Sequence, residues 1–125
     1  MAKELSITLE NKPGSLAKLT EALGAAGVNI NTFSAAAGSG SNCRIVVDDA
    51  AAARKAIEGA GLKVDGEREA LVVDLEDKPG ALGKVARKLA NAQINIDAAY
   101  VAGEGSGKKK VVVITADAEK AKGIL

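Results

Sequence analysis

The sequence predicts a tandem α+β protein: two small units, each an antiparallel sheet with its helices on one face. The first observation behind this prediction is an internal repeat, because residues 5–30 and 71–96 align without a gap and share 12 identical positions. The second is that both halves give the same order of expected strands and helices. A period of 66 residues has the length of a small domain and is too long for a solenoid repeat.

The first half, residues 1–67, is expected to hold a strand, a helix, two strands, a helix and a short fourth strand. Apolar and polar residues alternate over 5–10, as in a half-buried strand. Leucines then recur at helical spacing over 16–23, and Gly27 is a natural helix terminator. The remaining expected elements are strands 29–37 and 44–47 around a Gly/Ser loop at 38–41, a helix over 50–60 with Asp49 as N-cap, and a strand over 62–64.

The second half, residues 68–125, repeats this order without the last strand. Its expected elements are strand 71–76, helix 79–91, strand 94–102, Gly/Ser loop 103–107, strand 109–114 and helix 117–125. The polar segment 67–69 is the only candidate linker. A βαββαβ order is ferredoxin-like, and the missing last strand would leave strand 71–76 open to pairing with another chain.

Composition excludes several classes of function. The chain has no histidine, which removes histidine-based triads, general bases and metal ligands. Cys43 is the only cysteine, so it forms no intrachain disulfide or Cys-x-x-Cys site, and it is expected to pack in the core. A net charge of +1 and 2% aromatic residues give no argument for a nucleic acid or membrane partner. We therefore expect a cytoplasmic, non-enzymatic protein without metal or cofactor.

The turn between the first strand and first helix of each half is the place where a ligand is expected. It reads Asn-Lys-Pro-Gly-Ser-Leu at 11–16 and Asp-Lys-Pro-Gly-Ala-Leu at 77–82. Pro13 and Pro79 are expected at the first helical positions, where a missing N–H costs nothing. The glycines that follow leave the backbone N–H groups of the helix start open, which favours an anion such as a carboxylate. The alternative is that the segment is only a good turn and helix start.

Asn29 and Asn95 form a second repeated feature, each 15 residues after the glycine of its turn. An asparagine amide both donates and accepts hydrogen bonds, so it is able to hold the two charged ends of a zwitterion. Alternatively, each asparagine caps the last carbonyl groups of the preceding helix.

The Lys-Pro-Gly-x-Leu turn, the helix and the Asn-Ile pair, within a βαββαβ unit, resemble the ACT domain, and the resemblance covers essentially the whole chain. It implies a regulatory module that binds a small ligand, most often an amino acid, at an interface between two ACT units. By motif position, it places two sets of residues at ligand sites: Asn11, Pro13, Gly14, Ser15, Leu16, Asn29 and Ile30 in the first half, and Asp77, Pro79, Gly80, Ala81, Leu82, Asn95 and Ile96 in the second.

We also expect a homodimer, because halves of about 60 residues are marginal alone. A partner enzyme of amino-acid metabolism is expected to read a ligand-induced shift between two arrangements of the units. The rival hypothesis is an assembly module that dimerises through its sheets and binds no small molecule. The two halves are not equivalent, because Gln93 replaces the helix-ending glycine of the first half. A left-handed conformation there would cost about 1–2 kcal/mol, so the second site is expected to be the weaker one.

Overall fold

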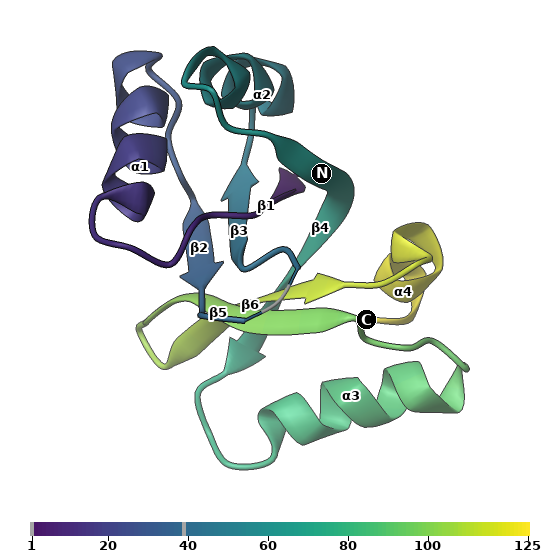
Figure 1. Ribbon diagram of the computed structural model, residues 1–125. Coiled ribbons are helices and arrows are strands. Elements are labelled where there is room, and N and C mark those ends of the chain that lie inside the picture. Colours follow the sequence, from purple (N-terminus) through teal and green to yellow (C-terminus); the bar gives the residue numbers. More distant parts are fainter. Residues whose placement is uncertain (1, 39) are drawn as a thin grey trace. The chain divides into compact units, whose positions relative to one another are not determined.

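The computed structural model describes residues 2–38 and 40–125, with four helices and six strands among them (Figure 1). The chain divides into two compact units, Met1–Arg68 and Glu69–Leu125. Both follow the predicted order of elements, and the α+β fold class is confirmed.

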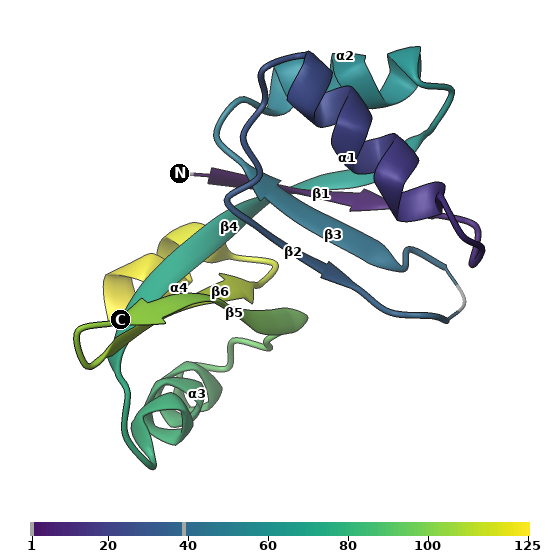
Figure 2. The ribbon, with the colours of Figure 1, turned by 90° about the vertical axis from the view of Figure 1, so that its left-hand side faces the viewer.

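Unit 1 is a four-stranded antiparallel sheet with two helices on one face. Its elements are β1 (Ala2–Ile7), α1 (Ser15–Ala25), β2 (Thr32–Ala35), β3 (Cys43–Val47), α2 (Ala50–Gly59) and the first part of β4 (Val64–Glu76). The strand order is β2-β3-β1-β4, and α1 and α2 lie beside each other over the sheet (Figure 2). Leu5, Ile7 and Ile45 on the sheet pack against Leu19 and Leu23 of α1, and all five are almost fully buried. This core holds β1 beneath α1 and so positions the turn between them.

Unit 2 repeats the architecture without a fourth strand. Its elements are the second part of β4, α3 (Ala81–Asn91), β5 (Ala98–Gly105), β6 (Lys108–Ile114) and α4 (Ala118–Ile124). The strand order is β4-β6-β5. Leu71 and Val113 on the sheet pack with Leu89 of α3 and Ala121 of α4, so both helices share one face.

The boundary between the two units lies between Arg68 and Glu69, inside the candidate linker at 67–69, and these residues are part of a strand. β4 is one continuous strand of 13 residues that supplies the last strand of unit 1 and the first strand of unit 2. The physical reason is local: between Val64 and Glu76 the sequence has no proline and one glycine, so nothing forces the extended chain to turn.

The prolines do not occupy the first helical positions, contrary to the prediction. Helix α1 begins at Ser15 with Gly14 as its N-cap at φ 92° and ψ −15°. The Ser15 N–H donates to the Lys12 carbonyl at 3.3 Å, which closes a type II turn with proline second and glycine third. Gly80 has φ 87° and ψ −13°, so the turn before α3 has the same form. The Lys-Pro-Gly segment of each unit therefore forms a type II turn, and the helix begins directly after the glycine.

The hairpin between β5 and β6 is tighter than expected. The sequence predicts a loop at 103–107, but β5 continues to Gly105 and only Ser106 and Gly107 form the turn. Their φ values of 54° and 75° are those of a type I′ turn. The second strands also begin later than predicted, at Thr32 and Ala98.

Helix ends agree well with the sequence. The Asp49 side chain accepts a hydrogen bond from the Ala52 N–H at 3.0 Å, which confirms it as the N-cap of α2. Asp117 accepts from Lys120 in the same way at the start of α4. Gln93 has φ 62° in the position where Gly27 has φ 72°, so this residue does adopt the left-handed conformation whose cost was considered above.

Candidate functional site

The start of α1 offers unused backbone donors. The Lys18 N–H is bonded to the Gly14 carbonyl at 2.9 Å, and the Ser15 N–H is bonded within the turn. In the described part of the chain, no side chain caps this helix end, and no acceptor is found for the N–H groups of Leu16 and Ala17. Because the positive end of the helix dipole lies here and the first turn has no acidic residue, an anion is favoured at this point.

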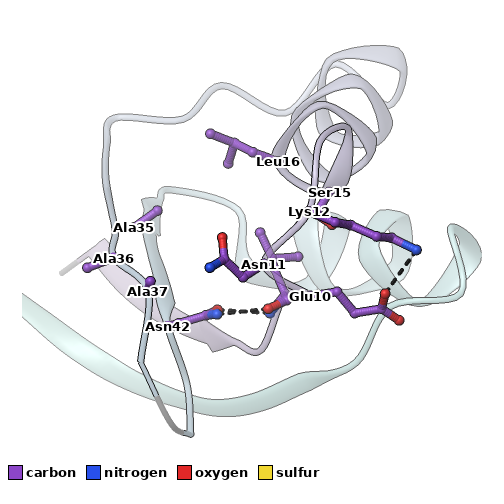
Figure 3. A pocket seen from close by; sticks show the side chains of 10 residues that line it. Glu10, Asn11, Lys12, Ser15, Leu16, Ala35, Ala36, Ala37 and Asn42 are labelled. Atoms are coloured by element: carbon purple, nitrogen blue, oxygen red, sulfur yellow. Dashed lines mark hydrogen bonds and ion pairs between the residues drawn. The ribbon is translucent and has the colours of Figure 1, made fainter.

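A hollow of about 210 Å³ lies beside this helix start (Figure 3). The turn contributes Asn11, the first turn of α1 contributes Ser15 and Leu16, and the segment 35–37 at the end of β2 forms the opposite wall. Sites for drug-sized ligands have about 300–1,000 Å³, so this hollow fits only a small molecule. Its wall is apolar at the three alanines and at Leu16, and it is polar at the turn.

Asn42 holds the hollow open, and the sequence interpretation missed it. Its Oδ1 accepts from the Leu9 N–H, and its Nδ2 donates to the Leu9 carbonyl, both at 2.8 Å. The β1–β3 ladder ends at the pair Ile7 and Cys43. Beyond it, the Asn42 side chain bonds the backbone of Leu9, two residues after the end of β1, in place of a backbone partner. The chain around Leu9 and the chain around Asn42 are thereby separated by the length of the Asn42 side chain.

The charges around the hollow are balanced. Glu10 and Lys12 form an exposed ion pair at 2.9 Å on its rim, and the hydrogen bond from Lys12 lowers the pKa of the Glu10 carboxyl. The Asn11 side chain is exposed, and no hydrogen bond of its amide is found among the described residues. The amide is thus available to a ligand.

The structure brings only part of the predicted first site together. Asn11, Ser15 and Leu16 line the hollow, whereas Pro13 and Gly14 face a neighbouring depression on the side of Lys18. The other two predicted residues lie past the opposite end of the helix. Among the described residues, Asn29 donates to the side chain of Asn31 at 3.3 Å and to no helix carbonyl, and Ile30 packs against the core. Within unit 1 these two residues do not line the hollow.

The predicted second site has the same helix start but a different surrounding. Gly80 is the N-cap of α3, and no described side chain caps this helix end. Ala81 and Leu82 are the first residues of α3. Asp77, the counterpart of Asn11, is engaged: Lys109 Nζ lies 3.1 Å from its Oδ1. Asn95 donates to Asp97 at 2.9 Å, and Ile96 packs against the core of unit 2. Pro79 lies in the turn and is exposed.

The remaining reactive group is enclosed. Cys43 is fully buried in the core of unit 1, as predicted, and burial raises the pKa of its thiol. Over residues 2–38 and 40–125, no group of histidine, cysteine, aspartate and glutamate side chains is arranged to hold a metal ion. In the same residues, no helix is both long and apolar enough to cross a bilayer.

The family model for the ACT domain matches residues 3–58 and again residues 70–125. The chain belongs to the ACT domain family. Each match lies within one of the two units, so the chain is a tandem of ACT units. No curated protein matches the chain at a significant level.

Solved structures similar to this tandem ACT chain share its whole length. A protein from Bacteroides thetaiotaomicron is 28% identical, with a TM-score of 0.83 over 99% of this chain and 85% of that one. The regulatory subunit of aspartate kinase from Thermus flavus is 21% identical, with a TM-score of 0.70 over 96% and 86%. The ligand-free subunit from Thermus thermophilus is 20% identical, with a TM-score of 0.67 over 96% and 86%. The two Thermus likenesses show a shared fold.

Proposed function

We propose that this ACT protein is a non-enzymatic regulatory module that binds an amino acid in the hollow of unit 1. The observation that carries the proposal is the meeting of three features in one place. These are an uncapped helix start, a free asparagine amide and a small apolar wall. Together they match a ligand that has a carboxylate, an ammonium group and a short side chain.

Each part of such a ligand has a partner in the hollow or at the helix start beside it. The carboxylate would accept hydrogen bonds from the N–H groups of Leu16 and Ala17. The ammonium group would donate to the amide oxygen of Asn11. The side chain would rest on Leu16 and on the alanines at 35–37, where a volume of about 210 Å³ leaves little room for a large group.

The regulatory step is a shift between two arrangements of the protein. A bound ligand favours one arrangement by the difference between its affinities for the two. A partner enzyme of amino-acid metabolism would read that shift. The ACT family supports this role, and the fold shared with regulatory subunits of aspartate kinase is consistent with it.

A second candidate function is assembly of two copies through their sheets. It is favoured by β2, which is the outermost strand of unit 1 and carries Phe33 at 53% exposure. An edge strand with an exposed aromatic side chain is suited to pairing with another chain. Light scattering of the wild type and of Phe33→Lys tests this function, since only the wild type should then be a dimer.

Thermal unfolding in the presence of each of the twenty amino acids tests the proposed ligand function. At least one amino acid at millimolar concentration should raise Tm, and Gly14→Asp should abolish that rise. A Cβ at Gly14 would meet no atom within 4 Å, so the added carboxylate has room and would compete for the helix start, although the φ of 92° at Gly14 makes the substitution strained. Circular dichroism confirms that the variant is folded. If no amino acid raises Tm of the wild type, the proposed function is wrong.

A further inference from the structure

The two units differ in the length of the hydrogen-bonded ladder between their central strands, which are β1 and β3 in unit 1 and β4 and β6 in unit 2. In unit 1 the β1–β3 ladder stops at Ile7 and Cys43. In unit 2 the β4–β6 ladder continues three residues beyond the equivalent position, to the pair Glu76 and Lys108. The Asp77 N–H then donates to the Gly107 carbonyl at 2.9 Å. The turn before α3 is therefore fastened to the hairpin, where unit 1 has the hollow and the Asn42 bridge.

Lys109 lies in β6 and contacts Asp77, in the turn before α3. It alternates along β6 with Val111 and Val113, two core residues, and so belongs to the face of the sheet that carries the helices. Its Nζ lies 3.1 Å from Oδ1 of Asp77. The hydrogen bond with Asp77 raises the pKa of the Lys109 ammonium group, so this group stays charged.

Asp77 and Asn11 are equivalent positions with different occupants. In unit 1 the Asn11 amide is free and faces the hollow. In unit 2 the ammonium group of Lys109, a residue of the protein itself, already forms an ion pair with the Asp77 carboxylate. An amino acid entering unit 2 would bring the same chemical group to the same partner, and it would have to displace Lys109.

We propose that Lys109 is a built-in occupant of the turn of unit 2: its ammonium group holds the position beside Asp77 that a bound amino acid would use. Unit 2 is then closed, and each chain binds one ligand, in unit 1. This inference rests on the proposed function, because it concerns the second copy of the same site.

The test is isothermal titration calorimetry with the amino acid that gives the largest rise of Tm in the wild type. Wild-type protein should bind one molecule per chain, and Gly14→Asp should bind none. Adding Lys109→Ala to Gly14→Asp should restore binding, because unit 2 loses its occupant. The matched control is Lys108→Ala in the same background, which removes a lysine from the opposite face of β6 and should restore nothing.

The outcomes separate this inference from the proposed function. Two ligands per wild-type chain, or a Gly14→Asp/Lys109→Ala variant that stays silent while the wild type binds, would overturn the role of Lys109. Absence of binding to every variant and to the wild type would overturn the proposed function itself, and this inference with it. If Gly14→Asp does not fold, Ala35→Phe blocks the hollow from the strand side and replaces it in each comparison.

Discussion

Replacing Asn42 by alanine should destabilise unit 1 and close its hollow. The Asn42 side chain makes two hydrogen bonds of 2.8 Å, one to each backbone group of Leu9. Leu9 is only 8% exposed. Without the amide, its N–H and carbonyl lose their partner in a place that water reaches poorly.

The size of the effect follows from these two bonds. A hydrogen bond contributes about 1 kcal/mol net, and a buried group left without a partner costs about 1–3 kcal/mol. Because Asn42 is itself partly exposed, water should replace part of each bond, and the total loss should be about 2 kcal/mol. For a domain of this size, that corresponds to a fall in Tm of about 8–16 °C.

Urea unfolding of Asn42→Ala, followed by circular dichroism, measures this loss. Asn31→Ala is the matched control, since the Asn31 side chain is exposed and bonds Asp48 at 3.0 Å at the surface. The control should lose less than about 0.5 kcal/mol. If the two variants are equally stable, Asn42 does not fasten Leu9 in the way described, and the explanation of the hollow is wrong.

Three further predictions concern the fold. Leu23→Ala should cost about 2–5 kcal/mol in urea unfolding, because Leu23 is fully buried in the core of unit 1; a loss below about 1 kcal/mol would contradict this packing. Gln93→Gly should raise the unfolding free energy by about 1 kcal/mol by relieving the left-handed conformation, and an unchanged or lower value would refute that explanation. Hydrogen bonds from Thr8 and Ser41 lower the pKa of the Asp65 carboxyl, so their stabilisation is present above the ordinary aspartate pKa of about 3.9 and is lost as the pH falls below it. The difference in unfolding free energy between wild type and Asp65→Asn should therefore shrink in acid, and a constant difference would show that Asp65 gains nothing from these bonds.

Most of the fold could be predicted from local sequence patterns. The repeat gave two units because equivalent leucines, such as Leu5 and Leu71, hold equivalent core positions. Asp49 could be recognised as an N-cap from its neighbours in the sequence alone. The proline position was misjudged because Pro-Gly satisfies both a helix start and a type II turn, and only the backbone conformation of Gly14 distinguishes them.

Less of the candidate site than of the fold could be predicted from the sequence. Asn11, Ser15 and Leu16 were predicted because they belong to the repeated turn. Asn42 was missed because its role depends on where the β1–β3 ladder ends, and its partner Leu9 lies 33 positions away in the sequence. The contact between Lys109 and Asp77 depends in the same way on strand register. The unequal halves were predicted from Gln93 and the missing strand, whereas the structure adds the longer β4–β6 ladder as a cause.

Nuclear magnetic resonance of ¹⁵N-labelled protein, titrated with the amino acid that stabilises it, tests the central claim most directly. The amide signals of Leu16 and Ala17 should move most, together with those of residues 35–37. Signals of Ala81 and Leu82, at the start of the other helix, should stay in place. Movement confined to unit 2, or no movement at the start of α1, would contradict the claim that the hollow of unit 1 binds the ligand.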